Sequence, residues 1–159
     1  MKKPNLNHIA TLAEIGAAIG VMMSVIYLSI QIEGSNKQLQ AQSYNDTLEM
    51  LHKPLELIVQ DSNLSDIALR AAADPASLTP SEWNRYSALL MLKFDAFEHA
   101  YYANESGEIR PELWKGIDAS FADDLRSNPG FRRFWEQSGK SFAEPFHGFI
   151  DAKLDERKP

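Results

Sequence analysis

The longest apolar stretch of the chain lies near its N-terminus, at residues 15–32 (IGAAIGVMMSVIYLSIQI), and it contains no formal charge. Extending the stretch back to residue 9 adds Glu14 as its only charged residue. At about 1.5 Å per residue, a helix over residues 9–32 would be about 36 Å long, which is enough to cross the hydrocarbon core of a bilayer. No later segment has this character, so we predict a single N-terminal transmembrane helix.

Two other interpretations of this stretch remain open. Lys2 and Lys3 precede it as in a secretory signal, but signal cores usually span roughly 7–15 residues, and residues 32–36 (IEGSN) contain no clean small-x-small cleavage pair. The buried helix of a soluble domain is the second alternative. The length and apolarity of the stretch favour an uncleaved anchor.

Small and polar residues share one face of the predicted anchor, while large apolar residues lie largely opposite. Gly16, Gly20 and Ser24 follow one another at a spacing of four residues. Small residues at this spacing let two helix backbones approach closely in lipid. The alternative is that glycine is simply common in membrane-spanning helices. We expect a helix–helix interface formed by seven residues: Ala13, Gly16, Ala17, Gly20, Ser24, Tyr27 and Gln31.

The polar segment after the anchor keeps a helical pattern. Its apolar residues recur at spacings near three and four, which predicts that the anchor continues into a juxtamembrane helix. Pro54 is expected to bend or restart this helix, and residues 61–63 are expected to end it. The apolar positions are Leu39, Leu48, Leu51, Leu55 and Ile58.

Helix start and stop signals divide the rest of the chain. A short helix is predicted at about residues 64–73, and Thr79-Pro80 with Glu82 forms a capping box that opens a helix of about 25 residues. Pro111 opens another helix, Asn128 caps a short one, and residues 141–144 (SFAE) form a second capping box that starts the last helix. The predicted fold is all-α: a transmembrane anchor (residues 1–34), a juxtamembrane helix (35–62) and a small helical bundle domain (63–159).

Charge limits the partners of this domain. Residues 33–159 carry 14 basic and 21 acidic side chains, a net charge of −7. This charge argues against binding nucleic acid through a basic face and against binding anionic lipid headgroups. Lys2 and Lys3 precede the anchor and Lys37 alone follows it closely, so the positive-inside rule weakly favours a cytoplasmic N-terminus. The chain has no cysteine, so redox chemistry does not identify the compartment.

Two pairs of residues are weak candidates for a metal site. Glu49 and His52 share a helix face, and so do Asp95 and His99. Two Glu-x-x-His helices with two further carboxylates make a di-iron site in a four-helix bundle, but the second pair here is spaced by four residues. Ordinary surface charges explain both pairs more simply. We find no glycine-rich phosphate loop and no Gly-x-Ser-x-Gly motif, so we predict no catalytic residue and no cofactor.

Several segments together resemble a group of uncharacterised bacterial proteins. These are the anchor AEIGAAIGVMMSVIYLSIQI, the run FDAFEHAYYANESGEI, and the later PELWKGI, NPGFRRFWE and FAEPFHGFID. The resemblance implies a single-pass protein of the bacterial inner (cytoplasmic) membrane with a helical domain behind the anchor, and it implies no activity. Proteins of this group tend to follow the anchor with arginine, whereas this chain has Glu33, which leaves the side of the membrane open.

The function expected from these patterns is that of a membrane-anchored helical interaction or scaffold protein. It would associate with itself or serve as an accessory subunit of a membrane complex through the anchor. A homo-oligomeric pore lined by the small and polar face is the first alternative. A metal-dependent helical-bundle enzyme is the second.

Overall fold

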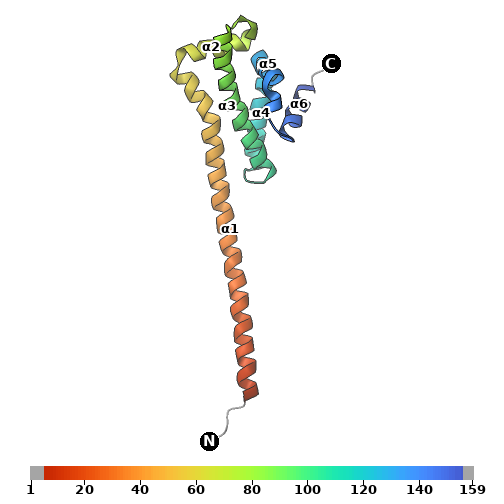
Figure 1. The fold of residues 1–159 in the computed structure, drawn as a ribbon. Helices are drawn as coiled ribbons and strands as arrows, with labels where there is room; N and C mark the ends of the chain where they lie inside the picture. The colour runs from red at the N-terminus through yellow and green to blue at the C-terminus, as the bar shows by residue number, and fades with distance from the viewer. Residues whose placement is uncertain (1–5, 156–159) are drawn as a thin grey trace. The chain divides into compact units, whose positions relative to one another are not determined.

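A computed structural model describes residues 6–155, with side-chain environments from residue 10 onward, and every regular element in this range is helical (Figure 1). The all-α prediction is therefore confirmed. The six α-helices are α1 (Leu6–Gln60), α2 (Ser62–Ala73), α3 (Pro80–Glu105), α4 (Pro111–Ser127), α5 (Pro129–Ser138) and α6 (Phe146–Asp155). Two short 3-10 helices occupy Pro75–Ser77 and Gly139–Ser141.

Helix α1 contains 55 residues and includes both Gly34 and Pro54. The predicted continuation of the apolar helix into the polar segment is confirmed, and the helix does not restart at Pro54. It ends at Gln60, before the predicted stop at residues 61–63, because Asp61 starts the next helix. The Asp61 carboxylate accepts a hydrogen bond of 3.0 Å from the amide of Leu64 and so caps α2.

Local signals placed most of the later helix starts correctly. The capping box at Thr79 and Glu82 is present at the start of α3, and Asn128 caps α5 by accepting a 2.9 Å bond from the amide of Gly130. The prediction that a second capping box at residues 141–144 starts the last helix was wrong, because α6 begins at Phe146. Pro145 explains the difference, since the residue before a proline is disfavoured in the helical conformation.

The chain separates into two compact units, Met1–Ala41 and Gln42–Pro159. The first unit consists of the N-terminal part of α1, and each residue from 10 to 41 is exposed. By length and composition α1 can cross a membrane; it is the one such helix in the described part of the chain, and its most apolar window has a mean hydropathy of 1.9. Lys2 and Lys3, on which the predicted orientation depends, lie outside the described residues.

Aromatic side chains fill the core of the second unit. The Phe94 ring on α3 lies 4.9 Å from Phe121 and 5.3 Å from Trp135, and Phe97 stacks on Phe121 at 3.8 Å. Helix α3 runs antiparallel to α4, and both contribute to this core together with α2, α5 and α6 (Figure 1). The aromatic residues that the sequence spaces along α3, α4 and α5 are therefore mainly core residues.

The last third of α1 belongs to this second unit and packs on its core. Thr47 is fully buried, and its hydroxyl donates a 2.8 Å hydrogen bond to the carbonyl of Ser43. The Ser43 hydroxyl donates in turn to Glu108, in the loop between α3 and α4, at 3.0 Å. Leu51 and Ile58 continue the same packed face. Two small hydroxyl side chains therefore occupy buried positions on this face of α1.

Candidate functional site

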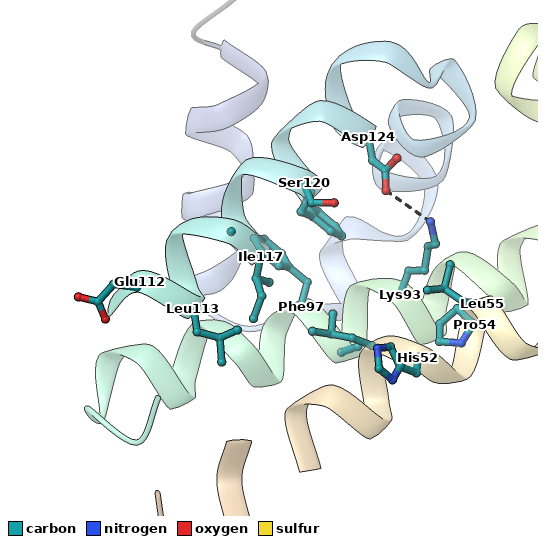
Figure 2. Close-up of a pocket in the computed structure, with 14 residues that line it drawn as sticks. His52, Pro54, Leu55, Lys93, Phe97, Glu112, Leu113, Ile117, Ser120 and Asp124 are labelled. Carbon is teal, nitrogen blue, oxygen red and sulfur yellow. Dashed lines mark hydrogen bonds and ion pairs between the residues drawn. The ribbon is translucent and has the colours of Figure 1, made fainter. Parts of the chain in front are cut away.

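A groove lies between α1, α3 and α4 within the second unit, and Figure 2 shows its lining. Its volume is about 410 Å³, within the usual range of small-molecule sites. The residues that line it are Leu51, His52, Pro54, Leu55, Lys93, Ala96, Phe97, Glu112, Leu113, Gly116, Ile117, Ser120, Phe121 and Asp124.

Helix α4 provides the long wall of the groove. Pro111 occupies its first turn, and the helical repeat then turns Ile117 and Phe121 into the core. A second row lies beside the first and faces the groove at spacings of four: Glu112, Gly116, Ser120 and Asp124. Because this row contains a glycine and a serine, the middle of the wall carries little side-chain bulk. A Cβ atom built on Gly116 would meet no atom within 4 Å.

Helices α1 and α3 provide the other wall and the floor. On α1, Leu55 lines the groove and remains 51% exposed, so an apolar side chain here faces open space. On α3, Ala96 and Phe97 form the floor; Phe97 is held in place by stacking on Trp114 at 5.5 Å. A rigid core residue therefore supports the bottom of the groove.

The acidic residues Glu112 and Asp124 lie at the two ends of the α4 wall, and Ser120 lies between them. The Lys93 ammonium lies 3.4 Å from the Asp124 carboxylate, marked by the dashed line in Figure 2, and 5.1 Å from the centre of the Phe131 ring. Glu112 lies at the opposite end, where its carboxylate points away from the other lining residues (Figure 2). The exposed His52 side chain lies at the rim on α1. This arrangement can hold an apolar body, and it has no nucleophile activated by an adjacent base.

A second hollow of about 490 Å³ lies near the end of α3 and is more polar. His99 lines it, and the Nε2 atom of this residue is buried without a hydrogen-bond partner in the described structure. Beside it on α3, burial raises the pKa of Asp95, and both burial and the Asp95 charge raise the pKa of Glu98. The other lining residues are Tyr102, Ala103, Glu105, Ser106 and Glu108.

The candidate metal residues occupy separate places. Glu49 and His52 are exposed on α1, and His52 lines the groove; Asp95 and His99 are partly buried on α3, and His99 lines the second hollow. Within residues 10–155, no three His, Asp or Glu side chains converge in a way that could hold a metal ion. The structure therefore provides no geometry on which to build the di-iron alternative.

The predicted helix–helix interface lies entirely within the first unit. All seven of its residues are exposed, from Ala13 to Gln31, and Glu14 is exposed as well. The Ser24 hydroxyl donates a 2.8 Å hydrogen bond to the carbonyl of Gly20, so its proton is satisfied within the helix. A Cβ atom on Gly16 or Gly20 would meet nothing within 4 Å. The small-residue face is thus open along its length.

Sequence reasoning missed the groove. The four-residue spacing of Glu112, Gly116, Ser120 and Asp124 was available as a signal, since it places small residues between two carboxylates on one helix face. The opposite wall comes from α1, more than 50 residues earlier in the chain, and no local pattern identifies that partner.

Neither a protein-family model nor a curated protein or solved structure matches the chain. The resemblance to a group of bacterial membrane proteins therefore stays a prediction.

Proposed function

We propose that this chain is a membrane-anchored helical interaction protein that associates with itself through the small-residue face of its anchor. The observation that carries the proposal is the complete exposure of an apolar helix. None of the most apolar window of α1 is buried by the rest of the chain. A helix that is apolar on all sides needs an apolar environment, and a lipid bilayer supplies one.

Exposure also argues against the soluble alternative. The core helix of a soluble domain is mostly buried, whereas Ile19 and Met22 are 53% and 64% exposed. The length of the apolar run argues against a cleaved signal, because signal cores are shorter. In this proposal the protein lies in the bacterial inner membrane with its N-terminus in the cytoplasm.

The association step rests on the open face at Gly16 and Gly20. In lipid, helices gain little from the hydrophobic effect and associate through close van der Waals packing, which small residues allow. Since the Ser24 hydroxyl already bonds to Gly20, it does not require a polar partner, and backbone proximity is the main contribution. This also makes a water-filled pore along the same face the weaker alternative.

Cross-linking of the full-length protein in native membranes tests the proposal. Gly20→Ile adds a branched side chain to the open face, where a Cβ atom would meet no side chain and no other segment of the chain, and we expect it to obstruct the close approach of a second helix. We expect that yield to fall at least fivefold. Met22→Ile, on the opposite face, is the matched control and should stay within twofold of the wild type.

Two results would contradict the proposal. If Gly20→Ile cross-links as the wild type does, the small-residue face is not the interface. If the wild-type protein is a monomer at every expression level, the anchor does not self-associate, and a role as an accessory subunit replaces it. Orientation is tested separately, by fusing a reporter that is active only outside the cytoplasm to the C-terminus. We expect this reporter to be active.

A further inference from the structure

We propose that α6 is a pH-sensitive latch, whose attachment to the rest of the second unit tightens when His147 is protonated. The residues concerned connect α5, the start of α6 and the segment before α6. All of them lie within the second unit, so the latch does not depend on the anchor or on self-association. Two carboxylates and one aromatic ring face His147, and their geometry determines the direction of the effect.

The two carboxylates beside His147 both take part in the attachment of α6. The Nδ1 atom of His147 lies 3.5 Å from the Glu144 carboxylate and 3.4 Å from the Asp151 carboxylate. Glu144 also accepts a 3.1 Å hydrogen bond from the amide of Gly148, which satisfies a free amide in the first turn of α6. Asp151 accepts a 2.7 Å bond from the Trp135 indole and so ties α6 to α5. His147 therefore lies between the carboxylate that caps α6 and the carboxylate that tethers it.

This polar network lies at the edge of an apolar contact. The buried Trp135 ring has its centre 5.3 Å from that of the His147 imidazole. On the inner face of α6, Phe146 and Ile150 are fully buried, and the Phe146 ring lies 5.6 Å from the Tyr101 ring of α3. Movement of α6 away from the core would expose these side chains to water. The network thus stabilises an apolar contact that is complete only while α6 is docked.

Three contacts of His147 become stronger when the imidazole is charged. Both carboxylates attract an imidazolium, and a cation within about 6 Å of a tryptophan ring centre is attracted to the ring as well. One interaction opposes them, because His147 is the second residue of α6 and the start of a helix carries about half a positive charge. Two full negative charges at 3.4 Å and 3.5 Å outweigh this partial charge. Protonation therefore strengthens the docking of α6.

Other titratable groups on the neighbouring elements do not reverse this direction. The hydroxyl of Tyr102 on α3 donates a 3.4 Å hydrogen bond to the carbonyl of Glu144 and carries no charge in this pH range. On α6, Lys153 pairs at 2.7 Å with a carboxylate of α4. Glu136 on α5 and Lys140 in the 3-10 helix before α6 are exposed, so water screens both charges.

The pH window follows from the ordinary chemistry of these groups. Histidine side chains change charge between about pH 5 and pH 8, and carboxylates are ionised above about pH 5. Because the charged imidazole stabilises the docked helix, its contribution is present at the acid end of this window and is lost as the pH rises. The side chains of Glu144 and Asp151 are half or more exposed, so water weakens both pairs. We expect a several-fold change in the docking equilibrium and no complete release of α6.

Native-state hydrogen exchange of the full-length protein in lipid nanodiscs tests the latch directly, with each rate corrected for intrinsic exchange at that pH. The amide of Ile150, on the buried side of α6, reports docking. The amide of Phe94, in the core of α3, reports unfolding of the whole unit. We expect the protection of Ile150 to fall at least about threefold from about pH 5.5 to about pH 8, with that of Phe94 unchanged.

Matched variants assign the effect to the network. His147→Gln removes the titrating group and should abolish the pH dependence of Ile150 protection. Glu144→Gln and Asp151→Asn keep the histidine and remove one charge each, so each should reduce the dependence and the double variant should abolish it. An asparagine at residue 151 can still accept a bond from the Trp135 indole. Glu136→Gln removes an exposed carboxylate of α5 outside the network and should behave as the wild type does.

Three outcomes would overturn the proposal. Equal protection of Ile150 at both pH values in the wild type means that α6 does not respond to pH. A fall that persists in His147→Gln assigns the response to another group. Parallel falls for Ile150 and Phe94 mean that the whole unit responds and that α6 is no separate latch. If His147→Gln loses its native spectrum, the double variant decides, and a full pH dependence in that protein contradicts the latch.

Discussion

The two units of this protein place the same kinds of side chain in opposite environments. Ile19 in the first unit is 53% exposed, whereas Ile67 in the second unit is 1% exposed. The first unit is apolar on most sides of one helix, and the second distributes its apolar residues along one side of several capped helices. Apolar content alone therefore does not predict burial; the pattern of apolar positions and the presence of neighbouring helices do.

The two units also differ in the surroundings of their glycine residues. In the first unit, Gly16 and Gly20 leave a helix face open, since a Cβ atom on either would meet nothing within 4 Å. On the second unit, Gly130 lets α5 pack closely, since a Cβ there would lie 2.8 Å from the Tyr86 ring and 3.1 Å from the Ala71 carbonyl oxygen. The same residue type thus lies on an open helix face in one unit and in a close intramolecular contact in the other.

The largest effect is expected from truncating the core of the second unit. Phe97→Ala removes a fully buried ring that stacks on Phe121 and Trp114, and we expect it to lower the free energy of unfolding of this unit by about 3–5 kcal/mol. The measurement is chemical denaturation of the nanodisc-bound protein, followed by near-ultraviolet circular dichroism. Ile19→Ala, in the first unit, should leave the transition midpoint unchanged. A comparable loss in both variants would contradict the separation of the two units.

The next largest effect is expected from a charge in the middle of the apolar helix. Val21→Arg should disfavour membrane insertion by about 2.5–3.5 kcal/mol, because an arginine at the centre of a bilayer is poorly solvated. The measurement is the fraction of protein that resists alkaline extraction from membranes. Leu69→Arg, at a residue that is 70% exposed in the second unit, is the control and should not change this fraction. Full retention of Val21→Arg would count against a membrane-spanning helix.

A pair of glycine substitutions within the second unit sharpens the comparison. Gly130→Ala crowds Tyr86 and the α2 backbone and should destabilise the unit by about 1–3 kcal/mol. Gly116→Ala meets no atom and replaces an exposed helical glycine, so it should stabilise the unit by up to about 1 kcal/mol. Both changes are measured by thermal unfolding. Destabilisation by Gly116→Ala would show that the α4 wall is packed more tightly than the structure indicates.

The smallest effect is expected from pH. Hydrogen bonds from Arg70, and then from Thr79, lower the pKa of Glu82 from its ordinary value of 4.5 to about 2. Because the folded-state pKa is depressed, this carboxylate stabilises the second unit fully above about pH 4.5 and progressively less as the pH falls toward 2. Its side chain is 26% exposed, so water screens the interaction in part.

The Glu82→Gln variant isolates this contribution. We expect its free energy of unfolding to fall less steeply than that of the wild type between pH 4.5 and 2, as measured by urea titration at a series of pH values. Glu136→Gln, at an exposed position on α5, should follow the wild-type profile. Identical slopes for all three proteins would show that the Arg70 contact does not persist in solution.

Local signals in the sequence determined much of the helical framework. The capping box at Thr79, the proline at residue 111 and the cap at Asn128 act within one helical turn, so they can be recognised without knowing the rest of the fold. The apolar run of α1 is likewise evident from its length. The pattern at residues 141–144 led to a wrong helix start. Pro145 disfavours the helical conformation of the residue before it, and this effect outweighs the capping box.

Only the tertiary structure decided which positions on these helices are buried and where a hollow forms. Along α1, Leu55 is half exposed while the polar Thr47 is fully buried, the reverse of what side-chain polarity predicts. The groove is lined by residues of α1, α3 and α4, and Gly116 and Ser120 leave little side-chain bulk on its α4 wall. Burial and cavities depend on segments far apart in the chain, and periodicity within one helix carries no information about its partner. The sequence by itself therefore determined most of the helices and the long apolar N-terminal segment, while packing between distant helices decided the candidate site.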